Sequence, residues 1–222
     1  MRSLTSAFFA VLLVFVCAAE GQTPSATNGA SDAEILAPLL SRLRGQHESV
    51  KIELRGGCST LAQRSVDLDL TLDADPDLNA HGTFSGIKHL FRSSPGISID
   101  QKQPRRIDVR SQDVWTAPFA IKLSDLHLDR IDRYNPDAAI DAAIGASVKS
   151  LRELHAATTL KTGGLREVPS TGRPHLPSST VYETLGDLLD DILRVFDGVL
   201  VYKECEKPDG MHVVDISFYR TP

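Results

Sequence analysis

The residues with the most defined chemistry in this sequence are its three cysteines. Cys17 lies in an apolar N-terminal stretch, whereas Cys58 and Cys205 lie far apart in the rest of the chain. If the N-terminal stretch is removed on export, two cysteines remain, which favours one disulfide. A widely spaced pair is neither a C-x-x-C redox motif nor enough ligands for a zinc site. We therefore expect a Cys58–Cys205 disulfide, with two buried thiols or a reactive thiol as the alternatives.

An acidic stretch begins like a calcium-binding loop. Asp73, Asp75 and Asp77 occupy the first, third and fifth positions of that loop. However, Leu78 stands in place of the glycine at the sixth position, and Phe84 in place of the glutamate at the twelfth. We interpret this stretch as a solvated acidic turn.

A second polar group consists of Asp125, His127 and Asp129, which alternate with leucines and would share one face of a strand. Two carboxylates and an imidazole could hold a divalent metal, although a solvent-facing polar stripe explains the same alternation. The other histidines form neither H-x-x-x-H nor H-E-x-x-H. The sequence therefore predicts no metal ligand and no cofactor.

The residues that could catalyse a reaction lack the required spacing. Asp190 and Asp191 are adjacent in a predicted helix, so they point in different directions and cannot form a paired acid and base. The serines lack the G-x-S-x-G pattern, and no glycine-rich nucleotide-binding motif occurs. No base is placed near Cys58 by the sequence. We predict a protein that is not an enzyme, with no catalytic residue.

Composition narrows the choice of partners. The chain is 41% hydrophobic and 24% charged, as in ordinary globular proteins. Its net charge of −5 disfavours a nucleic-acid partner, because phosphate binding needs clustered cations. The densest basic stretch is "KQPRR", Lys102 to Arg106. Its proline and its strand-like flanks favour a solvated turn over a site for an anionic partner.

Residues 1–21 have the features of a secretory signal peptide. Arg2 supplies the positive charge, and the apolar run Ala7 to Val16 is too short to span a bilayer. Small residues near Ala19 and Gly21 suit cleavage. A lipoprotein signal that uses Cys17 is the weaker alternative, because the bulky Val16 precedes it.

The rest of the chain should then be exported. Residues 22–31 form a small-polar, flexible linker, and no later stretch is apolar enough to cross a membrane. We expect a periplasmic or secreted protein without a transmembrane segment after signal removal.

Hydrophobic periodicity and turn residues predict the elements of the mature chain. Helices are expected at 32–43 with Asp32 as N-cap, at 84–91, at 136–157 with Asn135 as N-cap before Pro136, and at 181–196 behind a Thr180–Glu183 capping box. Strands are expected at 49–54, 65–74, 97–100, 106–110, 114–123, 125–131, 199–205 and 211–219.

The two halves share an order of helix, turn, strand and strand, with a further strand before the first copy. The stretch "TVYETLGDLLDDILRVFDGVLVYKEC" with "VVDISFY" resembles the STN domain, the small βαββ domain at the N-termini of secretins and TonB-dependent receptors. "GTFSGIKHLFRSSPGISIDQKQPRRIDVRS" fits the same outline. The whole chain also resembles a set of exported acidobacterial-type proteins with an "RYNPDAAIDAAI"-like helix and a final "VYxEC…ISF" segment. The STN resemblance implies protein–protein contacts in the envelope.

The sequence therefore predicts an α+β fold of two STN-like (β)αββ half-units, with small sheets and helices packed on one face. The first unit should span 32–160, including the helix at 136–157, and the second 179–222, with a Gly/Pro-rich loop at 161–178 between them. A Cys58–Cys205 bridge would then hold the two halves together.

The predicted function is that of a non-catalytic interaction or sensing module with an envelope protein as its partner. The alternative is a periplasmic protein that binds a small ligand or metal in the cleft between the halves.

Overall fold

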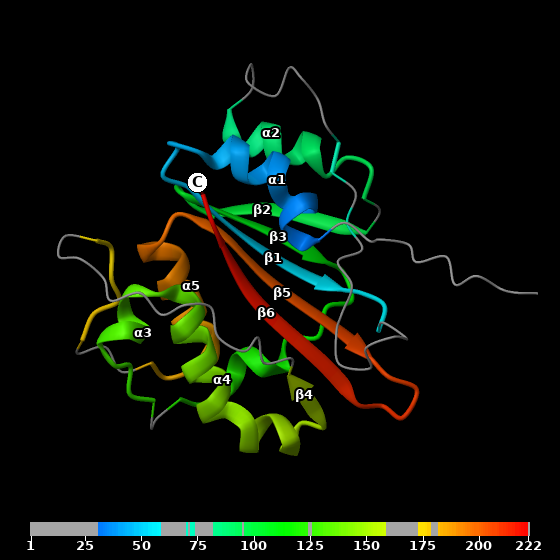
Figure 1. Cartoon of the computed structure of the whole chain (residues 1–222). Helices are drawn as coiled ribbons and strands as arrows, with labels where there is room; N and C mark the ends of the chain where they lie inside the picture. The colour runs from blue at the N-terminus through cyan, green and yellow to red at the C-terminus, as the bar shows by residue number, and fades with distance from the viewer. Residues whose placement is uncertain are drawn as a thin grey trace, which may run out of the picture.

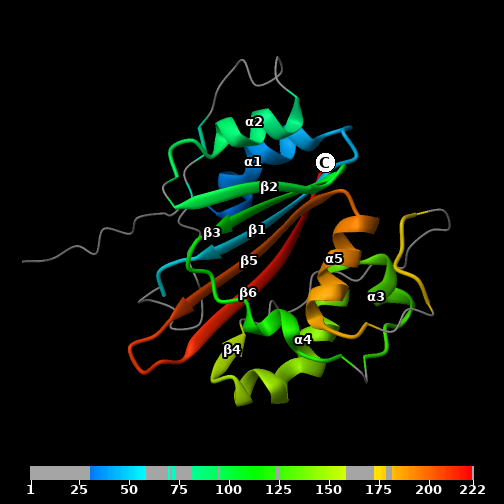
Figure 2. The same ribbon diagram turned by 180° about the vertical axis from the view of Figure 1, so that it is seen from behind.

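The computed structural model describes residues 31–58, 70, 72–73, 82–94, 96–123, 126–158, 173–178 and 182–221. They form a mixed six-stranded sheet in the order β2 (Ile97–Gln103), β3 (Arg106–Ser111), β1 (Ser49–Arg55), β5 (Gly198–Glu206), β6 (His212–Arg220) and β4 (Ala156–Thr158). Helices α1 (Asp32–Leu43) and α2 (Thr83–Leu90) lie on one side of the sheet. On the other side lie α4 (Pro136–Glu153), α5 (Leu185–Val195), the short α3 (Arg130–Tyr134) and the 3-10 helix η2 (Ala117–Ala120) (Figures 1 and 2).

The described elements form two halves with the same order, α1-β1-α2-β2-β3 and α4-β4-α5-β5-β6. In each half the first strand runs parallel to the third, and the second runs antiparallel to the third. The halves meet where β1 pairs in parallel with β5. Strand directions and helical faces are both reversed between the halves, while the order of equivalent strands across the sheet is kept. The halves are therefore related by a rotation of about 180° around an axis in the sheet plane, perpendicular to the strands, together with a shift along that axis.

The α+β class is confirmed, but two details of the predicted architecture differ. The halves share one continuous sheet instead of forming two small ones, because β1 pairs with β5 along the whole length of β1. The helix at 136–157, expected in the first unit, lies with the second half. Ile140 and Ile144 of α4 share a core with Leu188 and Ile192 of α5, and the adjoining β4 pairs with β6.

Each face of the sheet buries its own apolar core. Beneath α1 and α2, Leu36, Leu39 and Ile87 pack against alternate residues of β1, β3 and β5. Beneath α4 and α5, Leu188 and Ile192 pack against the other alternate residues of β5 and β6. Because the side chains of a strand alternate between faces, the unbroken run Val199 to Tyr202 serves both cores.

The helix starts agree with the sequence in one case and differ in two. Asn135 caps α4, and its side chain accepts a hydrogen bond from the Asp137 N–H. The N-cap of α1 is Ser31, one residue before the expected Asp32, and Ser31 forms a capping box with Glu34. Helix α5 begins later than the expected Thr180–Glu183 box and uses Thr184 with Asp187 instead. Extended backbone continues to Thr184 because this residue bridges to Lys122.

The strands predicted at 114–123 and 125–131 are wrong in the described residues. Pro118 lacks an N–H for a sheet ladder, and the chain around it turns into η2, leaving an isolated bridge at Lys122. Asp129 instead caps α3 through a capping box with Asp132. The apolar alternation had a different cause, because Ile121 and Leu123 fill the core under α5 without forming a strand.

The disulfide prediction is confirmed. Cys58 and Cys205 are bonded, with their Cα atoms 5.4 Å apart. Cys58 follows the end of β1 and Cys205 lies in β5, so the bond ties neighbouring strands from different halves.

Other predictions concern residues outside the described ranges. These are the signal peptide at 1–21 with Cys17, nearly all of the linker at 22–31, most of the strand at 65–74, and loop residues 161–172. Of the predicted loop, residues 173–178 are described, and Leu176 among them is fully buried in the α4–α5 core. In the ranges that the structure covers, no helix is both long and apolar enough to cross a membrane.

Candidate functional site

The face of β1 and β3 that lies toward α5 is charged instead of apolar. In β1, Lys51 and Glu53 alternate with Val50 and Ile52, and only the two apolar residues face α1 and α2. The register places Asp108 of β3 beside Lys51. Lys51 and Glu53 are nevertheless buried, with side chains only 6% and 2% exposed. Buried charges are costly unless they are paired, so their partners determine whether this layer is stable.

Ion pairs connect these charges across both halves. The Lys51 Nζ atom lies 3.0 Å from Glu53 Oε1 and 3.2 Å from Asp190 Oδ1 of α5. Arg106 lies 3.0 Å from Asp190 and 2.8 Å from Asp108. The network therefore joins β1 and β3 of the first half to α5 of the second.

Electrostatics keep this network ionised. Burial opposes the charge on Asp190, but the hydrogen bond from Arg106 and the charge of Lys51 outweigh it and lower the pKa of that carboxyl. Burial likewise acts against the charge on Arg106, yet its bonds to Asp190 and Asp108 raise the pKa of the guanidinium. The salt bridge between the halves therefore persists through the neutral pH range.

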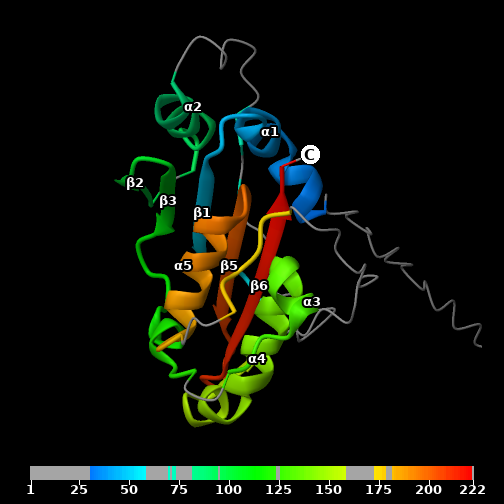
Figure 3. The same ribbon diagram turned by 90° about the vertical axis from the view of Figure 1, so that its left-hand side faces the viewer.

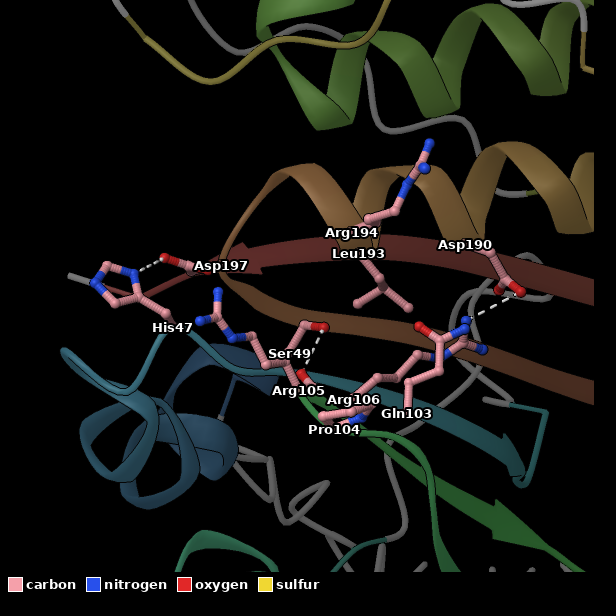
Figure 4. Close-up of a pocket in the computed structure, with 10 residues that line it drawn as sticks. All are labelled: His47, Ser49, Gln103, Pro104, Arg105, Arg106, Asp190, Leu193, Arg194 and Asp197. Atoms are coloured by element: carbon pink, nitrogen blue, oxygen red, sulfur yellow. Dashed lines mark hydrogen bonds and ion pairs between the residues drawn. The ribbon is translucent and has the colours of Figure 1, made fainter.

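A pocket of about 430 Å³ opens beside this network, between the two halves. The first half contributes residues before and in β1 and the β2–β3 turn, and the second contributes α5 and the residue before β5 (Figure 4). The lining residues are His47, Ser49, Gln103, Pro104, Arg105, Arg106, Asp190, Leu193, Arg194 and Asp197.

Most charges in the pocket already have partners. His47 Nδ1 lies 3.0 Å from Asp197 Oδ2, and Arg194 pairs with Asp191 at 2.7 Å. In contrast, the Arg105 guanidinium forms no ion pair or hydrogen bond with any residue in the described part of the chain. Its backbone carbonyl lies 3.5 Å from Ser49 Oγ, and its side chain extends into the pocket (Figure 4).

A second polar cluster lies beside the disulfide, around the buried Glu204 of β5. The Trp115 N–H donates to Glu204 Oε1 over 3.2 Å, and His212 Nδ1 lies 3.4 Å from Glu204 Oε2. The rings of Trp115 and His212 stack with centroids 4.0 Å apart. Tyr202 donates to the Trp115 carbonyl, and burial raises the pKa of its hydroxyl far above its usual range. These contacts hold the segment before η2 against the sheet.

The outer edge of the first half is β2, which no strand among the described residues covers on its far side. Figure 3 shows β2 at the margin of the sheet, away from α4 and α5. Ser98, Asp100, Gln101 and Lys102 are exposed. The regular pairing with β3 covers Ile97–Asp100 and is interrupted before Gln103. The opposite edge, β4, is only three residues long.

Of the other candidate metal ligands from the sequence, Asp73, His127 and Asp129 lie in the described ranges. Asp73 accepts hydrogen bonds from Ser93, whereas Asp75, Asp77 and Asp125 lie outside the described ranges. Asp129 caps a helix. Within the described ranges, no group of three or more potential ligands could hold a metal.

Asp190 and Asp191 do point apart, as predicted. Asp190 joins the charged layer, and Asp191 pairs with Arg194.

The charged layer and the pocket were not predicted. The stretch at Lys102–Arg106 was interpreted as a solvated turn, and Pro104 and Arg105 do form the turn. However, the side chain of Arg106 is only 11% exposed and is paired. A useful signal was available in the alternation of β1, whose polar face carries charges of both signs.

A scan of protein-family models, a search of curated proteins and a search of solved structures each gave no match for this chain.

Proposed function

We propose that this chain is an exported, non-catalytic interaction module that binds an extended segment of an envelope protein along β2. The observation that supports this proposal is the outer edge of β2, which no strand in the described ranges covers and whose backbone groups can form a further ladder. The regular part of the edge, Ile97–Asp100, suits a short partner segment. The resemblance to STN domains points to the same kind of contact.

The length of β2 favours docking of a partner strand on this edge of the sheet over the opposite edge, β4. Strand β2 has seven residues, whereas β4 has three and offers few backbone groups. The disulfide and the β1–β5 pairing hold the rest of the sheet in place. A partner strand would therefore meet a preformed edge, which lowers the entropy lost on binding.

The test is site-specific photo-crosslinking of the full chain in its native host. A photoreactive residue at Gln101 should give a discrete adduct with one envelope protein. The same residue at Lys149, which is 91% exposed on α4, should not. The variant Gln101→Pro removes a backbone N–H from the edge at a position where β2 has no register partner in β3. In this variant, a photoreactive residue placed at position 100 should no longer form the adduct, while the melting temperature stays nearly unchanged. Equal adducts at Gln101 and Lys149, or an adduct that survives the proline, would contradict the proposal.

A second candidate function, binding of a small ligand, is favoured by the pocket between the halves. A volume of about 430 Å³ lies within the usual range of small-molecule sites. The pocket combines two apolar side chains, Leu193 and Pro104, with several hydrogen-bond donors.

A further inference from the structure

We propose that the pocket between the halves binds an oxyanion, a phosphate or carboxylate group of a small ligand, on the side chain of Arg105. This inference rests on the second candidate function and names the chemistry of its ligand. It does not depend on a partner at β2.

The three arginines that line the pocket differ in their partners. Arg106 is committed to Asp108 and Asp190, and Arg194 is paired with Asp191 and directed away from the pocket (Figure 4). Arg105 alone among these three has no carboxylate within ion-pair distance in the described part of the chain. A guanidinium presents several N–H donors in one plane, which match two oxygens of a carboxylate or phosphate.

Of the two carboxylates in the pocket lining, the one nearest Arg106 is already compensated by cations. Asp190 lies within ion-pair distance of Lys51 and Arg106, whereas Asp197 contacts His47. An incoming anion therefore meets the unpaired charge of Arg105, with Asp197 as the main opposing carboxylate. Ser49 also lines the pocket beside Arg105, and its hydroxyl can turn toward a ligand oxygen because its present bond of 3.5 Å to the Arg105 carbonyl is weak.

One side of the pocket is also held in place. The Arg106–Asp190 pair joins the β2–β3 turn to α5, whereas the His47–Asp197 contact is exposed and contributes little to this order. A preformed site loses less conformational entropy when it binds. Leu193 provides an apolar wall, so a ligand with a short hydrocarbon part beside its oxyanion should fit best.

The experiment is a titration of the full mature chain, followed by amide chemical shifts in NMR spectra, at constant ionic strength set with chloride. The two probes are inorganic phosphate and succinate. We expect saturable shifts in residues around 47–49, 103–106 and 193–197 with at least one probe. Saturation by phosphate alone would assign the site to phosphorylated ligands, and saturation by succinate alone to carboxylic acids. Saturation by both would assign it to a bare oxyanion.

Matched variants distinguish binding at Arg105 from nonspecific electrostatic attraction of the anion to the protein. Arg105→Gln should weaken binding about tenfold or more, because it removes a charge-assisted hydrogen bond. Arg92→Gln removes the same charge just after the end of α2, on the other side of the sheet. It should change the affinity for either probe less than about twofold. Asp197→Asn removes a negative charge from the pocket and should tighten binding.

Three results would overturn the proposal: no saturable shift with either probe, unchanged affinity in Arg105→Gln, or equal weakening in Arg92→Gln. Crosslinking from β2 tests the sheet edge, whereas these titrations test the pocket. Failure of the β2 proposal and failure of the anion site can therefore be told apart.

Discussion

The two halves hold each other through the same device, used once on each face of the sheet. On the α5 face, Asp190 pairs with Lys51 of β1, which belongs to the other half. On the α1 face, Asp32 pairs at 2.6 Å with Lys203 of β5, which again belongs to the other half. In both cases a helical aspartate reaches across the β1–β5 junction to a buried lysine.

The surroundings of the two contacts differ. Lys203 also lies 3.2 Å from Asp215, and the Tyr219 hydroxyl donates a hydrogen bond to Asp32 in the first turn of α1. The charges of this contact are therefore surrounded by protein groups. Burial raises the pKa of the Tyr219 hydroxyl well above its usual range, which keeps it a donor. Around Lys51, by contrast, the cations Arg106 and Arg110 add further pairs, and the layer opens into the pocket with Arg105. The comparison indicates that one contact is structural and closed, whereas the other borders a surface available for binding.

The lysines give the largest expected effects. Lys203→Met leaves Asp32 and Asp215 without that cation, and we expect a loss of about 3–5 kcal/mol in the free energy of unfolding. Lys51→Met should cost less, about 2–3 kcal/mol, because Arg106 still faces Asp190 and Arg110 still faces Glu53. Urea unfolding of both variants measures the difference, with the exposed Lys149→Met as a control near zero. A larger cost for Lys51→Met would show that the comparison is wrong.

Loss of the disulfide should lower the free energy of unfolding by an amount comparable to or slightly smaller than the loss of Lys203, because the bond closes a loop between the halves. The double variant Cys58→Ser/Cys205→Ser should lose about 2–4 kcal/mol, mainly through greater freedom of the unfolded chain. Urea unfolding of the wild type in reductant should give the same midpoint as the double variant. Reductant should leave the variant itself unchanged. Equal midpoints for oxidised wild type and variant would mean that the paired strands alone hold the halves together.

Local features of the fold could be predicted because their causes lie close together in the sequence. The apolar spacing of α5, the Asn135 cap and the turn at Pro104 depend only on neighbouring residues. The disulfide followed from a count of cysteines in a chain that the sequence predicts to be exported. The expected strands at 114–123 and 125–131 failed because alternation alone cannot distinguish a strand from an irregular segment that fills a core.

The shared sheet and the pocket could not be predicted, because each depends on pairing between distant segments. Nothing in the residues of β1 specifies β5 as its neighbour instead of another apolar strand. Once that pairing exists, Lys51 comes under α5 and meets Asp190, and Arg106 closes the network. An alternating apolar and charged strand usually indicates a solvated face, and only tertiary packing reveals that this one is covered.

The smallest expected effect is the pH dependence of stability that comes from the Lys51–Asp190 contact, which borders the pocket. The pKa of Asp190 in the folded chain lies below its unfolded value of about 3.9. Its contribution is therefore complete above that value and is lost as the pH falls through the folded pKa. Because the Asp190 side chain is 46% exposed, solvent screens the pair, and we expect no more than about 1 kcal/mol.

Asp190→Asn should thus be less stable than the wild type at pH 6, and the gap in melting temperature should narrow as the pH falls below about 3.9. The neighbouring Asp191→Asn serves as the control, because Asp191 pairs with Arg194 on the outer side of α5 and does not contact Lys51. A gap for Asp190→Asn that stays constant between pH 6 and pH 3 would mean that loss of charge is not what destabilises it. The contact would then act through packing alone, as an apolar contact would, and the distinction between the open and closed contacts would rest only on the pocket.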